Sequence, residues 1–135
     1  MAERLPLRVA LWALAAWLLA GCMLMSGEAT TIDLQEGSGN QLTTFVGAEG
    51  SAARRVEVGA PGAELQVIAI VSVESGDLEL SLVQPDGAVA FAVAARPDAQ
   101  VTRSGSVRAD DDGAITYTIS ARGARNGSYQ IFVQP

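Results

Sequence analysis

The segment from Ile115 to Ala121 reads Ile-Thr-Tyr-Thr-Ile-Ser-Ala, so its apolar and polar side chains alternate strictly. Successive residues of a β-strand point to opposite faces of a sheet, and this alternation therefore predicts one buried face and one solvated face. The segment from Leu78 to Leu82, Leu-Glu-Leu-Ser-Leu, repeats the pattern. Both segments predict half-buried strands of an antiparallel sheet.

Further short apolar runs lie on either side of these two segments, and none carries a convincing helical period. The predicted strands are 41–46, 54–58, 65–73, 78–83, 89–94, 104–109, 115–121 and 128–133. Turn-forming residues separate them: Pro61 with Gly62, Ser75 with Gly76, Pro85 with Asp86 and Gly87, Asp112 with Gly113, and Asn126 with Gly127. Asp-Gly and Asn-Gly pairs tolerate the positive φ angles of tight hairpins. The spacing predicts an all-β, antiparallel β-sandwich or barrel, of which we expect the sandwich.

The first residues of the chain carry the features of an export signal. Arg4 and Arg8 precede an apolar run from Val9 to Leu19, and small residues follow it. A basic start, a short apolar middle and small residues before a cleavage point are what an export machine and its peptidase require.

The run ends in Leu19, Ala20, Gly21 and Cys22, which resembles the lipobox of bacterial lipoproteins. In that family the cysteine thiol receives a diacylglycerol, a peptidase cuts before it, and the new amine is usually acylated. The resemblance implies that 1–21 is a lipoprotein signal peptide and that lipid on Cys22 holds the protein on the extracytoplasmic face of an inner or outer membrane. The alternative is an uncleaved single-pass anchor, because uncharged residues continue to Gly27, close to the ~20 that span a bilayer.

Residues 22–40 are predicted to form the lipidated N-terminus and a flexible tether, which leaves 41–135 for the β-sandwich domain. The segment is rich in Ser, Gly, Thr, Glu and Gln and has only a weak apolar signal, at Ile32 and Leu34. The alternative is that part of it forms a first edge strand.

Charge and composition exclude several functions. Removal of Glu3, Arg4 and Arg8 with the signal leaves 7 basic and 14 acidic residues of the original 9 and 15. An acidic surface repels phosphate backbones, so we expect no nucleic-acid partner. The chain has no His and no Lys, which excludes Ser-His and Cys-His pairs, Ser-Lys dyads and Schiff bases. Paired carboxylates remain, but none lies where burial would raise its pKa, and we predict no enzyme.

Two acidic clusters are candidate metal sites. Asp110, Asp111 and Asp112 are consecutive, and oxygen-rich loops of this kind can hold calcium, although the spacing is not that of an EF-hand. Asp77 and Glu79 are two residues apart and therefore share one strand face. The alternatives are a solvated hairpin turn for the first cluster and an exposed polar face for the second.

A second resemblance lies in the C-terminal half. The segments 76–82, 85–87 and 127–133 read Gly-Asp-Leu-Glu-Leu-Ser-Leu, Pro-Asp-Gly and Gly-Ser-Tyr-Gln-Ile-Phe-Val. They resemble the bacterial pre-peptidase C-terminal domain, which typically reads Gly-Asp-Leu-Asp, Pro-x-Gly and Gly-x-Tyr, and the match covers about 63–135. The resemblance implies a jelly-roll-like sandwich with an accessory role. Glu79 replaces the usual second Asp, and we find no peptidase domain in the sequence. Either the client is a separate envelope or secreted protein, or the fold serves another purpose.

Three functional hypotheses follow. The first is a membrane-anchored, non-catalytic accessory or binding module of the cell envelope, with no cofactor beyond the lipid on Cys22. The second is a calcium-dependent ligand or polysaccharide binder, and the third is a structural envelope protein that acts through protein contacts. Both tryptophans lie in the signal, and Tyr117 and Tyr129 are predicted to be core residues, so the domain offers no evident aromatic platform for sugars.

Overall fold

The computed structural model describes residues 23–135, and this part of the chain consists of eight β-strands without a helix. The strands are β1 (Leu24–Ser26), β2 (Ala29–Gln35), β3 (Ser38–Glu57), β4 (Glu64–Ser72), β5 (Ser75–Val83), β6 (Val89–Ala95), β7 (Val101–Arg108) and β8 (Ala114–Gln134). Among these residues there is accordingly no apolar helix long enough to cross a membrane. The predicted signal peptide 1–21, with Leu19, Ala20 and Gly21, and the lipidation site Cys22 lie outside the described residues.

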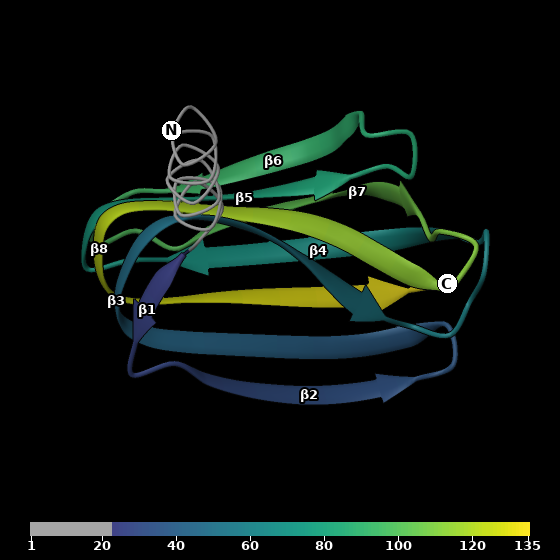
Figure 1. Cartoon of the computed structure of the whole chain (residues 1–135), viewed down its shortest axis with the longest axis horizontal. Helices are drawn as coiled ribbons and strands as arrows, with labels where there is room; N and C mark the ends of the chain where they lie inside the picture. The colour runs from purple at the N-terminus through teal and green to yellow at the C-terminus, as the bar shows by residue number, and fades with distance from the viewer. Residues whose placement is uncertain (1–22) are drawn as a thin grey trace, which may run out of the picture.

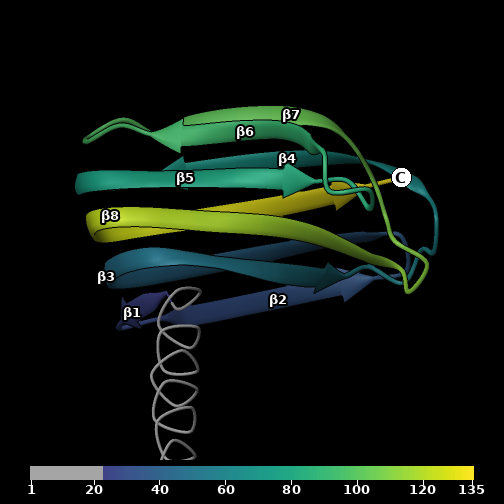
Figure 2. The ribbon, with the colours of Figure 1, turned by 45° about the horizontal axis from the view of Figure 1, so that its top comes forward.

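The strands form two layers, because one hydrogen-bonded sheet folds over on itself (Figures 1 and 2). One layer contains β2, the first half of β3, the second half of β8, β4 and β7, in that order. The other contains the second half of β3, the first half of β8, β5 and β6. All of these pairs are antiparallel, and the prediction of an all-β, antiparallel β-sandwich is confirmed.

β3 and β8 each run through both layers and bend together where they cross. We call this bend, 46–50 of β3 with 121–127 of β8, the corner, and the opposite end of the sandwich the turn end. The ladder continues through the corner with Gly47 opposite Arg125, and it shifts register between Ala48 and Gly50. Such an irregularity bends a strand without ending it.

The predicted hairpin at Asn126 and Gly127 is therefore wrong, and two pairs of predicted strands are continuous: 41–46 with 54–58, and 115–121 with 128–133. The positive φ angles of Gly123 (56°) and Asn126 (48°) turn the chain inside β8. Gly127 allows close packing there, since an added Cβ would lie 2.5 Å from a ring carbon of Phe45. The turn-forming residues Asn126 and Gly127 therefore bend a continuous strand instead of closing a hairpin.

The predicted flexible tether over 22–40 is wrong for the described residues 23–40, and the alternative of a first edge strand is confirmed. β2 pairs along its whole length with β3, from Ala29 opposite Thr44 to Gln35 opposite Ser38. β1 pairs with β3 at the corner. An edge strand has a neighbour on one side only, and most of β2 is exposed, so its sequence does not need a strong apolar pattern.

The core lies between the two layers and contains the alternating residues that the sequence predicted. Ile115 and Ile119 of β8 and Leu80 and Leu82 of β5 are fully buried. Their neighbours in sequence, such as Glu79, point outward. Burial of these apolar side chains drives the two layers together.

Candidate functional site

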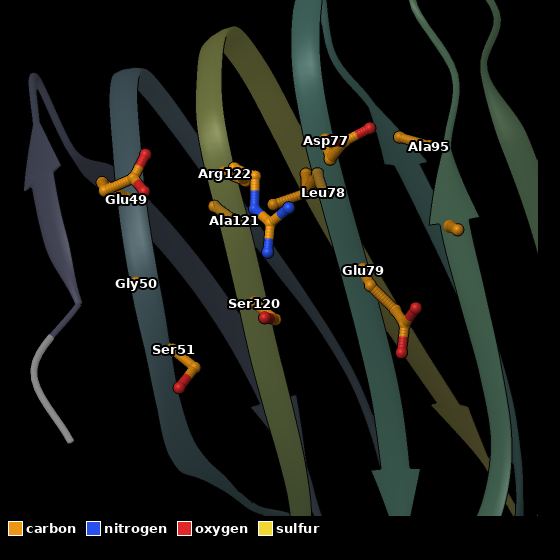
Figure 3. Close-up of a pocket in the computed structure, with 11 residues that line it drawn as sticks. Glu49, Gly50, Ser51, Asp77, Leu78, Glu79, Ala95, Ser120, Ala121 and Arg122 are labelled. Atoms are coloured by element: carbon orange, nitrogen blue, oxygen red, sulfur yellow. The ribbon is translucent and has the colours of Figure 1, made fainter. Parts of the chain in front are cut away.

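A groove of about 620 Å³ opens on the outer face of the layer formed by β3, β8, β5 and β6, beside the corner (Figure 3). One row of cross-strand neighbours runs through it. Ser51 of β3 lies opposite Ser120 of β8, which lies opposite Glu79 of β5, which lies opposite Ala94 of β6. Three of these four side chains are small, and this explains why the sheet is hollowed here.

Charged side chains surround this row. Asp77 of β5 lies directly opposite Arg122 of β8, and Glu79 follows on the same face of β5. Figure 3 shows the guanidinium of Arg122 along β8, with Asp77 and Glu79 projecting from the neighbouring strand. The ion pairs within 4.0 Å among residues 23–135 involve Arg54 and Arg55, and none of them involves Arg122.

The prediction that Asp77 and Glu79 share a face is confirmed, and the structure adds Arg122, Ser51 and Ser120 to them. Sequence reasoning missed these three residues because their proximity depends on the pairing of β8 with β3 and β5. The only signal for Arg122 was that it directly follows the alternating segment 115–121. Continuing the alternation by one residue places Arg122 on the outer face, with Ser120.

Glu49 borders the groove at the corner and has a structural contact of its own. Its carboxylate accepts a hydrogen bond from the backbone N–H of Gly123. This contact joins the bend of β3 to the bend of β8. Glu49 therefore holds the corner in shape and leaves Asp77, Glu79 and Arg122 as the main charged groups open to a ligand.

The groove suits hydrogen bonding to a polar ligand. Its side chains offer carboxylates, hydroxyls and one guanidinium, and none of the described residues that line it is an aromatic residue on which a sugar ring could stack. Glu49, Asp77 and Glu79 outnumber Arg122, which disfavours an anionic ligand.

The three consecutive aspartates lie at the turn end, away from the groove. Asp110 caps the β7–β8 turn, because its carboxylate accepts hydrogen bonds from the backbone N–H groups of Asp112 and Ala114. Arg55 donates to the same carboxylate at 2.9 Å. The bond from Ala114, followed by that from Asp112 and the charge of Arg55, holds the pKa of Asp110 below its usual range. Asp111 and Asp112 are exposed.

The structure does not bring these acidic residues together as metal ligands. Among residues 23–135 no group of three or more His, Cys, Asp or Glu side chains is arranged so that it could hold a metal ion. Asp77 and Glu79 lie beside the corner, and Asp110 is engaged by the turn and by Arg55. The structure places the first cluster in a hydrogen-bonded turn and the second on an exposed strand face, and calcium binding at either cluster stays a prediction.

A second polar cluster lies in the interior, next to the edge formed by β2 and β3. The buried Gln41 donates a hydrogen bond to the hydroxyl of Tyr117 at 2.9 Å, and the hydroxyls of Tyr117 and Tyr129 are 3.3 Å apart. The two rings pack with their centroids 5.8 Å apart and tilted by 60°. Burial is the main cause that raises the pKa of Tyr117. Both tyrosines are core residues, as predicted.

The two adjacent arginines of β3 point to opposite faces, as successive residues of a strand do. Arg54 faces the interior side and donates to Glu28 at 2.7 Å, and this hydrogen bond raises the pKa of the guanidinium. Arg55 faces outward and pairs with Asp110. Each arginine therefore has a structural partner, and neither belongs to the groove.

Comparisons with known proteins yield structural likenesses alone: no family model matches the sequence, and no curated protein matches it. A carbohydrate-binding module of Cellvibrio mixtus lichenase 5A in complex with cellotriose is 15% identical, with coverage of 83% of this chain and 89% of that one and a TM-score of 0.40. A xylan-binding domain from Paenibacillus barcinonensis is 11% identical, with coverage of 83% and 84% and a TM-score of 0.43. A chain of the disulfide-linked pili of Bacillus endospore appendages is 9% identical, with coverage of 84% and 93% and a TM-score of 0.49. Likenesses at this level carry no argument about function.

Proposed function

We propose that this protein is a non-catalytic binding module that lipid on Cys22 holds at the extracytoplasmic face of a cell membrane, and that the groove beside the corner binds a polar ligand. The observation that carries the proposal is the cross-strand arrangement of Arg122, Asp77 and Glu79 over a floor of small residues. A neutral or cationic saccharide chain fits this groove, because its hydroxyls can pair with carboxylates and a guanidinium alike.

The residue types support a binding role over a catalytic one. The chain contains no His and no Lys, and its single Cys precedes the described domain. The groove therefore offers no activated nucleophile and no base of the usual kinds other than its carboxylates. The resemblance to the pre-peptidase C-terminal domain fits an accessory role in the same way.

The ligand is tested with the purified full-length protein in detergent against a panel of immobilised neutral, cationic and anionic oligosaccharides. We expect binding to neutral or cationic chains such as xylohexaose or chitohexaose, weak or no binding to polygalacturonate, and a loss of binding in Arg122→Ala and Glu79→Gln. Asp111→Asn is the matched control, since it removes an exposed carboxylate at the turn end. Equal binding by all four proteins would contradict a role for the groove.

The anchor is tested separately by metabolic labelling with a clickable fatty acid. We expect the wild-type protein to take up label and to pellet with membranes, and Cys22→Ala to lose the label. Mass spectrometry of the N-terminal peptide then distinguishes a cleaved, lipidated chain from an uncleaved anchor. Persistent labelling of Cys22→Ala would contradict lipidation at this residue.

A further inference from the structure

We propose that the corner of the sandwich rests directly on the bilayer, with Leu24 and Val46 in contact with lipid, and that the acidic turn end points away from the membrane. The proposal rests on the lipid anchor proposed above. It adds how the domain is oriented on the membrane and which surface touches it.

The first argument is that no linker separates the lipidated Cys22 from the folded domain. Met23 is half-buried and packs against the core, and Leu24 already begins β1. Cys22 is one peptide unit from Met23, which corresponds to about 3.8 Å between Cα atoms. A lipid on Cys22 therefore brings the corner to the membrane surface.

The second argument is the apolar surface at this place. Leu24 is 74% exposed and Val46 is 55% exposed, and they are two of the four large hydrophobic residues exposed among residues 23–135. They line one shallow hollow of about 380 Å³, together with the apolar residues Met25, Ala48 and Ala124 and the charged residues Glu49 and Arg125. Figure 1 shows β1 lying at the bend of β3, so this hollow and the start of the domain share one end of the sandwich. Apolar side chains beside a lipid anchor add to its membrane affinity.

The third argument is the difference in charge between the two ends. The turns of the turn end, 36–37, 58–63, 84–88 and 109–113, contain five acidic residues and no basic one: Glu36, Asp86, Asp110, Asp111 and Asp112. The connections and bends at the corner, 27–28, 46–50, 73–74, 96–100 and 121–127, contain Arg96, Arg122 and Arg125 with Glu28, Glu49, Glu74 and Asp98. Anionic lipids repel the turn end more strongly than the corner, and this favours the same orientation.

The experiment uses the lipidated protein in vesicles of phosphatidylethanolamine and phosphatidylglycerol that contain doxyl-labelled phosphatidylcholine. Val46→Cys and Val89→Cys introduce a thiol at the corner and at the turn end, on side chains of similar exposure, 55% and 60%. Because lipid consumes the thiol of Cys22, an environment-sensitive fluorophore labels only the introduced cysteine. We expect the doxyl lipid to quench the label at residue 46 and to leave the label at residue 89 unchanged.

A variant with an inserted linker tests whether the short connection between Cys22 and Met23 holds the corner at the membrane. Insertion of 15 Gly and Ser residues between Cys22 and Met23 adds an end-to-end distance of roughly 20 Å. We expect this variant to stay lipidated and membrane-bound, and the label at residue 46 to lose most of its quenching.

Each other outcome overturns a defined part of the account. A lipidated protein whose two labels are quenched equally, or not at all, overturns the orientation and leaves the anchor intact. A free, fluorophore-labelled Cys22 in the unsubstituted protein overturns the anchor itself, and the orientation with it.

Discussion

The interior of the sandwich is held together differently on its two sides. Between β4, β5, β6 and β7 it is apolar throughout, as the full burial of Val67, Leu80 and Val107 shows. Next to the β2–β3 edge, the buried side chains include Gln41 and the hydroxyls of two tyrosines. The comparison teaches that one sheet can close on itself by non-directional burial on one side and by directional hydrogen bonds on the other.

The largest expected effect lies on the apolar side. Leu80→Ala removes the methine and methyl groups of a fully buried side chain, and we expect it to lower the free energy of unfolding by about 2–5 kcal/mol. The matched change on the edge strand is Ile32→Ala, at a side chain that is 56% exposed. It should change the free energy of unfolding by less than about 0.5 kcal/mol. Chemical unfolding followed by circular dichroism measures both, and equal losses would contradict the assignment of β2 as an exposed edge.

On the polar side, the hydrogen bond from Gln41 to Tyr117 is the sharpest test. Gln41→Leu keeps the approximate volume and leaves the buried Tyr117 hydroxyl with Tyr129 as its remaining partner. We expect a loss of about 1–3 kcal/mol in the free energy of unfolding. The double variant Gln41→Leu with Tyr117→Phe removes both partners and should cost less than the sum of the single changes. Simple additivity would mean that the bond does not couple the two residues.

The same contrast explains what the sequence could predict. β4 is strongly apolar and β5 alternates apolar and polar residues, and the predictions 65–73 and 78–83 lie close to the observed Glu64–Ser72 and Ser75–Val83. Over β1 and β2 the sequence favoured a tether and gave an edge strand only as the alternative, because an edge strand beside a polar interior has no need of apolar alternation. The merging of strands into β3 and β8 was missed because Asn126 and Gly127 have turn chemistry whether a chain reverses there or bends.

The candidate site was predictable in part for a related reason. Asp77 and Glu79 share a face by the local geometry of one strand, so their spacing sufficed. Arg122 and Ser51 belong to other strands, and their position beside Asp77 and Glu79 depends on a register that includes an irregularity at Ala48 and Gly50. Nothing in the sequence around Arg122 reports this long-range pairing.

Alkaline pH probes the polar side without a substitution. Because burial raises the pKa of Tyr117, the folded state keeps its hydroxyl protonated where the unfolded chain already ionises. The stabilisation from this shift is complete below the ordinary pKa of 10.0 and is lost as the pH rises above it. We expect a slope of up to about 1.4 kcal/mol per pH unit above pH 10, from one proton. Tyr117→Phe should flatten the unfolding profile there, and an unchanged slope would assign the effect to another group.

The smallest effect is expected for the ion pair between Arg54, in the second half of β3, and Glu28, which directly precedes β2. The two side chains are about a third exposed, and solvent and salt screen their 2.7 Å contact. A double-mutant cycle with Arg54→Met and Glu28→Gln should therefore give a coupling of about 0–1 kcal/mol, which shrinks at high salt. A larger, salt-insensitive coupling would place the pair in the same cooperative network as Gln41 and Tyr117. The polar side would then close the sandwich by a continuous set of directional contacts, in which the charged pair carries as much weight as the buried hydroxyls.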